Sequence, residues 1–179
     1  MGAARVDPRS DEELVASGNA GDEGALAAIY WRYRDWAAWI AVRYVDGEAA
    51  QDVVQEAFIY LFGKFPGFRL RAKLTTVLYP AVRNSALALK RRKAPEHLGE
   101  GHEQVAPIPP GFLIGSTRLG LALTRLPDGQ REVLLMRAVD DMSVPEIALA
   151  LGIPEGTVKS RLHHALAAMR ESLGDPGLG

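Results

Sequence analysis

The sequence predicts an all-α fold, with two small helical domains joined by a flexible linker and a helix-turn-helix in the C-terminal domain. Apolar residues recur at helical spacing along most of the chain, and no alternating Val/Ile/Thr run between turn pairs indicates a strand. A stretch rich in proline and glycine interrupts the helical pattern between residues 94 and 116. Near the C-terminus, residues 143–170 combine a helix cap, a turn glycine and a second helix.

Capping and turn residues set the expected elements in order. In the N-terminal domain, helices are expected at about residues 11–17, 23–44, 49–62 and 74–92. The first should end at Gly18, and the Pro66-Gly67 pair should follow the third. A second helical block is expected from about Leu119 to Leu173. The expected division is residues 1–93 for the first domain, 94–119 for the linker and 120–179 for the second domain with a frayed tail.

The net charge of −1 conceals a strong segregation of charge along the chain. From Lys64 to Lys93 the chain carries lysines and arginines but no aspartate or glutamate, a pattern that suits a nucleic-acid partner. No apolar stretch approaches the roughly 20 residues of a membrane span, and residues 1–10 lack the apolar centre of a secretory signal. The expected location is therefore the cytoplasm. No cysteine is present to form a disulfide or a thiolate metal site.

The helix-turn-helix prediction depends on the order of cap, turn and small residues. Ser143 and Glu146 form an S-x-x-E capping box, in which each side chain satisfies a backbone N–H at the helix start. Gly152 lets the chain leave this helix after about two turns, and Pro154 pre-sets the first turn of the next. Ala148 is small enough for the two helices to meet at a steep angle. An ordinary helical hairpin with a solvated basic face is the alternative.

At about 100° per residue, the second of these helices has an apolar stripe and an opposite face of small, polar and basic residues. The stripe comprises Val158, Leu162, Ala165, Leu166 and Met169. The opposite face with its flanks, which we expect to enter the major groove of DNA, comprises Glu155, Gly156, Thr157, Lys159, Ser160, Arg161, His163 and His164. Metal binding by the two histidines is the weaker alternative, because adjacent side chains on a helix diverge by about 100°. No metal site is predicted.

Two separate stretches of the chain resemble one known family. The run from Leu126 to Leu173, and GIPEGTVKSRLHHAL within it, is similar to the fourth conserved region of the small extracytoplasmic-function sigma factors. Far upstream, DVVQEAFIYLF (Asp52 to Phe62) resembles their second conserved region. The resemblance implies a subunit that binds core RNA polymerase and promoter DNA and that an anti-sigma factor holds inactive. It implies no enzyme activity and no cofactor, and we expect the free chain to be monomeric.

The resemblance also assigns roles to residues of the N-terminal domain. The side of the Asp52 helix that is expected to bind polymerase comprises Asp52, Gln55, Glu56 and Ile59. The residues that correspond to the −10 DNA contacts are Tyr79, Arg83, Asn84, Lys90 and Arg91. An aromatic side chain there would stack on separated bases. Solvated helix faces are the alternative for both sets of residues.

The −10 region departs from the family pattern W-L-Y-R-I-A-R-N-x-A-L-D. This chain has Val77 for the tryptophan, Pro80 for an arginine and Ala88 for the aspartate. A proline inside a helix removes a backbone hydrogen bond, so Pro80 is expected to kink or restart the helix. The alternatives are therefore a sigma-like regulator with impaired promoter melting and a stand-alone helix-turn-helix regulator, which would normally dimerise on a palindromic site. No phosphate loop, H-E-x-x-H or nucleophile elbow supports an enzyme.

Overall fold

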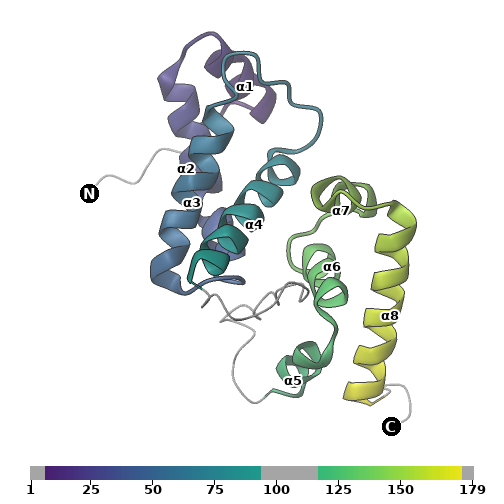
Figure 1. Cartoon of the computed structure of the whole chain (residues 1–179). Helices are drawn as coiled ribbons and strands as arrows, with labels where there is room; N and C mark the ends of the chain where they lie inside the picture. The colour runs from purple at the N-terminus through teal and green to yellow at the C-terminus, as the bar shows by residue number, and fades with distance from the viewer. Residues whose placement is uncertain (1–6, 94–116, 175–179) are drawn as a thin grey trace. The chain divides into compact units, whose positions relative to one another are not determined.

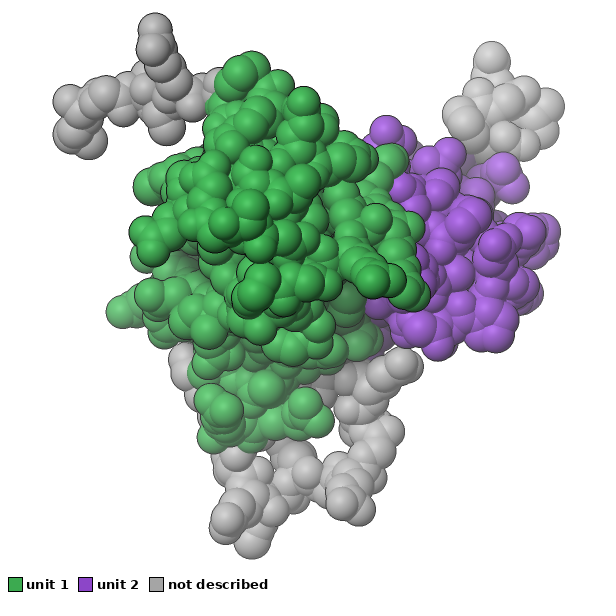
Figure 2. Space-filling model, turned by 90° about the horizontal axis from the view of Figure 1, so that it is seen from above, with its two compact units in different colours: residues 1–93 green, residues 94–179 purple. Residues whose placement is uncertain are grey.

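The computed structural model describes residues 7–93 and 117–174, and the regular elements in these ranges are all helices (Figure 1). The chain divides into two compact units after Lys93, shown in different colours in Figure 2. The predicted all-α fold with two helical domains is therefore confirmed. The expected linker lies mostly outside the described residues, and so does the tail from residue 175 onward. No helix within the described ranges is long and apolar enough to cross a lipid bilayer.

The first unit is built on three helices that pack against one another in pairs (Figure 1). They are α2 (Glu23–Ala41), α3 (Gly47–Phe62) and α4 (Leu74–Lys93), and α1 (Asp11–Asn19) packs on α2. Fully or almost fully buried aliphatic side chains from all four helices form the core, among them Leu14, Ile29, Val53 and Leu78. Burying one such side chain contributes about 1.5–3 kcal/mol. This core, more than helix propensity, stabilises the four elements.

Helix α1 ends at Asn19, so the prediction that it stops at Gly18 is wrong. Gly18 is a buried residue of the helix. A Cβ at this position would lie 2.8 Å from Cδ2 of Leu26 and 3.0 Å from Cε1 of Phe65. Gly18 therefore permits close packing, and the chain turns instead at Gly21, which has a φ of +92°.

Helix α4 runs through Pro80, so a restart at this proline, one of the two outcomes expected from the sequence, does not occur. Pro80 has no N–H to donate to the carbonyl of Thr76 one turn earlier. The hydroxyl of Thr76 is also buried, and no hydrogen-bond partner for it is present among the described residues. Neighbouring Leu78, Tyr79 and Val82 are completely buried. Their packing offsets the missing hydrogen bond.

The second unit is arranged around α8 (Glu155–Leu173), which contacts the three other helices of the unit. These are α5 (Arg118–Arg125), α6 (Asp128–Ala138) and α7 (Val144–Leu151). A buried cluster joins Leu123 and Leu126 to Ala165 and Met169 of α8. The long C-terminal helix therefore provides one side of the core along much of its length.

Arg131 connects α5 to α6 from inside the second unit. Its side chain is buried, and its guanidinium donates to the carbonyl oxygens of Leu123 at 2.9 Å and Leu126 at 2.7 Å. The last carbonyls of a helix have no helical donor, so Arg131 supplies donors that α5 lacks. Burial lowers the pKa of Arg131, and the carboxylate of Asp128, 3.4 Å away, opposes this change.

Candidate nucleic-acid interface

The helix-turn-helix has the local geometry that its sequence predicts. The backbone N–H of Ser143 donates to Oε2 of Glu146 at 2.7 Å, and the N–H of Glu146 donates to Oγ of Ser143 at 3.4 Å, which confirms the capping box. Gly152 ends α7 in the left-handed region, with a φ of +66°. A residue with a side chain would be strained there. The turn between α7 and α8 is therefore short, and it uses a backbone conformation that Gly152 adopts without strain.

Helix α8 presents most of the predicted DNA-contact residues to solvent. The exposed ones are Glu155, Gly156, Lys159, Ser160, His163 and His164, and Thr157 is half-buried. On the opposite side Val158 and Met169 are buried. Leu166, at 43% exposure, is the exception to the predicted apolar stripe. The ammonium group of Lys159 lies 3.5 Å from the carboxylate of Glu155, and an exposed pair of this kind costs little to separate.

Arg161 departs from the prediction that it faces DNA. Its side chain is half-buried, and its guanidinium lies against Gly129 in the first turn of α6. A Cβ on Gly129 would be 2.8 Å from Nη1 of Arg161 and 2.9 Å from Cζ. The missing side chain of Gly129 thus leaves the space that the guanidinium occupies. In this position Arg161 supports α8 against α6 instead of projecting from the outer face of α8.

His163 and His164 lie on the exposed side of α8, and their rings meet edge to face with centroids 5.6 Å apart. Within residues 7–93 and 117–174, no group of three or more His, Asp or Glu side chains is arranged to hold a metal ion. Imidazole rings offer a donor and an acceptor to base edges and phosphates. Their position therefore suits contacts with DNA.

Helix α3 has one buried and one exposed side, as its sequence pattern predicts. The buried residues include Val53, Val54, Ala57 and Leu61. The residues expected to bind polymerase, Asp52, Gln55, Glu56 and Ile59, are all exposed. Ile59 is 66% exposed among these polar neighbours. An apolar centre with a polar surround is the usual composition of a protein-docking surface.

Tyr79, which we expected to stack on separated DNA bases, is not accessible. Its exposed fraction is 0%, its hydroxyl lies 3.1 Å from that of Tyr44, and its ring lies beside Trp36. Stacking on a base would require this side chain to leave the core, so the predicted role is wrong. The other residues predicted at the −10 DNA reach the surface fully or in part: Arg83, Asn84, Lys90 and Arg91.

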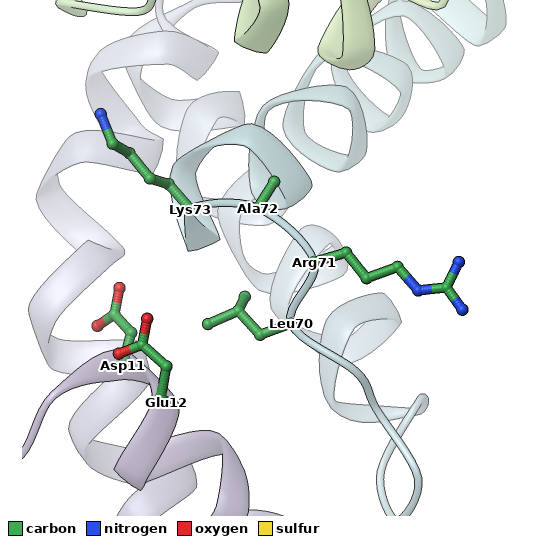
Figure 3. Close-up of a pocket in the computed structure, with 6 residues that line it drawn as sticks. All are labelled: Asp11, Glu12, Leu70, Arg71, Ala72 and Lys73. Carbon is green, nitrogen blue, oxygen red and sulfur yellow. The ribbon is translucent and has the colours of Figure 1, made fainter.

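A surface hollow that we did not expect from the sequence lies between the start of α1 and the segment before α4 (Figure 3). It has a volume of about 400 Å³ and is lined by Asp11, Glu12, Leu70, Arg71, Ala72 and Lys73. Leu70 points toward the two carboxylates, whereas Arg71 extends away from them. Arg71 and Lys73 belong to the basic run, the stretch from Lys64 to Lys93 that contains no aspartate or glutamate. Their position beside α1 depends on packing between distant segments, which sequence periodicity does not report.

Two family models match the chain, in the order of its two units. The model of sigma-70 region 2 matches residues 29–96, and the model of sigma-70 region 4 matches residues 116–169. The chain is 30% identical to the ECF RNA polymerase sigma factor SigW of Bacillus subtilis (strain 168), over 87% of this chain and 92% of that protein. It is 31% identical to the ECF RNA polymerase sigma-E factor of Escherichia coli (strain K12), over 89% and 92%.

Solved structures have the same fold. CnrH, in a complex with the cytosolic domain of CnrY, matches with a TM-score of 0.68 and 23% identity, over 91% of this chain and 96% of that one. RpoE from Bartonella quintana, in a co-crystal with the anti-sigma factor NepR, matches with a TM-score of 0.59 and 20% identity, over 82% and 95%. From the two matched regions, and from relatives at least 30% identical over most of their length, the chain belongs to the family of ECF RNA polymerase sigma factors.

Proposed function

We propose that this chain binds core RNA polymerase through the exposed side of α3 and directs it to promoters whose −35 element is read by α8. The observation that supports this most strongly is that each matched region carries an exposed surface of suitable chemistry. Region 2 has acidic side chains around exposed Ile59, and region 4 has a small, polar and basic face on α8. The chain directs the polymerase in the cytoplasm and catalyses no reaction of its own.

In the proposed −35 complex, the first half of α8 enters the major groove. The small residues Gly156 and Ser160 let the helix approach the base edges, and Lys159 supplies a positive charge for a phosphate or a guanine. His163 and His164 extend this surface along the helix. Arg161 does not contact DNA in this proposal, because its guanidinium packs against α6 and supports α8.

The N-terminal unit contacts the opened DNA strand through its basic run. In α4 these residues are Arg83, Asn84, Lys90 and Arg91, and cations of the segment before α4 add to them. Contacts between lysine or arginine and phosphates release counterions, so the affinity should fall steeply with salt. Tyr79 has no part in these contacts, since it is buried.

We also propose that a protein inhibitor regulates the chain. RpoE from Bartonella quintana, which shares its fold, was crystallised with the anti-sigma factor NepR. An inhibitor of this class should form a complex with the free chain and prevent its binding to core polymerase. Size-exclusion chromatography of the three components would show whether the inhibitor and core polymerase compete.

The substitution Asp52→Ala tests the polymerase contact. It should weaken binding to core polymerase by about 1 kcal/mol or more and leave binding to an isolated −35 duplex unchanged. Glu23→Ala, which removes the same charge from the exposed start of α2, is the matched control. Equal affinities of all three proteins for core polymerase would exclude the α3 surface. If the chain formed a homodimer and did not bind core polymerase, the proposed function as a whole would be excluded.

The substitution Lys159→Ala tests the DNA contact. If Lys159 reaches a base edge, the affinity for a −35 duplex should fall by about 1–3 kcal/mol. Binding to core polymerase should be unchanged, the reverse of the result expected for Asp52→Ala. Fluorescence anisotropy with a labelled duplex measures the change. Unaltered duplex binding would remove Lys159 from the interface.

A further inference from the structure

The segment between α3 and α4 is a basic loop (residues 63–73). Its charged residues are Lys64, Arg69, Arg71 and Lys73, and it contains no acid. Loops normally lie on the surface and are more mobile than the elements they connect. A mobile loop would have to lose that freedom when its cations bind phosphates, which lowers affinity. Contacts that hold the basic loop in place should therefore raise its affinity for DNA.

The side chain of Asn19, at the end of α1, binds the backbone at the middle of the basic loop. Its Oδ1 accepts from the N–H of Gly67 at 2.7 Å and from the N–H of Phe68 at 3.0 Å. Its Nδ2 donates to the carbonyl oxygen of Phe68 at 2.8 Å. One amide group thus makes three hydrogen bonds to two consecutive residues. Gly67 has a φ of +105°, so these bonds select a turn that most side chains would resist.

Close packing reinforces the hydrogen bonds of Asn19. Gly18 leaves the space into which Phe65 of the basic loop fits against α1. The ring of Phe65 lies 5.2 Å from that of Phe68 and 6.4 Å from that of Phe62 at the end of α3. Aromatic pairs at these separations are stabilising. The loop is therefore joined to both α1 and α3.

Helix α1 is itself held at its other end by α2. The guanidinium of Arg32 donates to Oδ1 of Asp11 at 2.6 Å. It also donates to the carbonyl oxygens of Asp7 and Arg9, at 2.8 and 2.7 Å. The hydroxyl of Tyr33 donates to the second carboxylate oxygen of Asp11. A helix held in this way can act as a rigid support for the loop that it contacts.

We infer that α1 is a brace for the basic loop and that Asn19 is a positioning residue for the binding of the opened DNA strand. This inference rests on the proposed function, because it assumes that the loop cations contact DNA. Asn19 touches only the backbone of the loop in the contacts described above. It therefore acts through the neighbouring cations, of which Arg69 directly follows Phe68 and is exposed.

The test is a double-mutant cycle between Asn19→Ala and Arg69→Ala in the full-length chain bound to core polymerase. The readout is the affinity for a labelled, mixed-sequence single-stranded DNA at several salt concentrations. Asn19→Ala should weaken binding about tenfold, and its effect should largely disappear when Arg69 is already alanine, because coupled residues are not additive. Binding to core polymerase should be unchanged.

The matched control is the cycle between Asn19→Ala and Arg91→Ala. Arg91 is exposed on α4, about 25 Å beyond the start of that helix at 1.5 Å per residue, so the two effects should add. Equal binding by wild type and Asn19→Ala, or additive effects with Arg69→Ala, would overturn the brace and leave the proposed function intact. A wild-type holoenzyme that fails to bind the strand would instead contradict the proposed function.

If Asn19→Ala does not fold, amide hydrogen exchange in the wild-type chain tests the same inference. In the wild-type chain, the backbone amides of Gly67 and Phe68 should exchange as slowly as those of the adjacent helices, because both are hydrogen-bonded to Asn19. Exchange at the rate of an open loop would show that Asn19 does not hold the segment.

Discussion

Arg161 and Tyr79 show how a single side chain can differ from the expectation raised by its position on a helix. Helical periodicity places Arg161 beside an outward-facing set of residues, and the family resemblance places Tyr79 among the −10 DNA contacts. However, the long stem of arginine can bend along apolar surface, and the guanidinium of Arg161 uses the space above Gly129. Tyr79 is drawn into the core by Tyr44 and Trp36. These partners are distant in the chain, so the pattern of neighbouring residues does not reveal them.

The contact between Arg161 and Gly129 leads to a prediction about stability. Arg161→Ala should lower the free energy of unfolding of the second unit by about 1 kcal/mol, since it removes packing between α8 and α6. Lys159→Ala, two positions earlier and exposed, should change it by less than about 0.5 kcal/mol. Urea unfolding followed by circular dichroism measures both values. If the two variants were equally stable, Arg161 would not support α8 in solution.

At the scale of elements, helix boundaries were predictable where a cap or turn residue acts locally. The capping box of Ser143 and Glu146 and the left-handed Gly152 were expected, and both are present. The end of α1 was not predicted correctly, because Gly18 permits close packing against Phe65 and does not form a turn. The continuous passage of α4 through Pro80 has a similar cause, since its buried neighbours outweigh one lost hydrogen bond. Tertiary packing, in both cases, overrides a local signal.

Replacement of Pro80 offers a direct test of this explanation. Pro80→Ala restores an N–H that can donate to the carbonyl of Thr76, so we expect the free energy of unfolding of the first unit to rise by roughly 1–3 kcal/mol. Pro145→Ala is the matched control, because Pro145 lies in the first turn of α7, where proline is well tolerated. The free energy of unfolding of the second unit should change little in Pro145→Ala. A loss of stability in Pro80→Ala would contradict the assignment of Pro80 as a defect offset by packing.

At the scale of the whole molecule, the order of the two units and the chemistry of their surfaces could be predicted. The α8 face and the α3 face each lie within one helix, so periodicity identifies most of their residues. The hollow between α1 and residues 70–73 could not be predicted in this way, and neither could the hydrogen bonds from Asn19 of α1 to the basic loop. Both depend on contacts between segments that are far apart in the sequence.

The central claim is that this chain directs core RNA polymerase to specific promoters. The most direct measurement is run-off transcription with core polymerase and the purified chain over a pool of genomic promoters. We expect discrete transcripts that require the chain, start downstream of a shared −35 sequence and are reduced by Lys159→Ala. Transcription that is unchanged by the chain, or that shows no promoter preference, would contradict the claim.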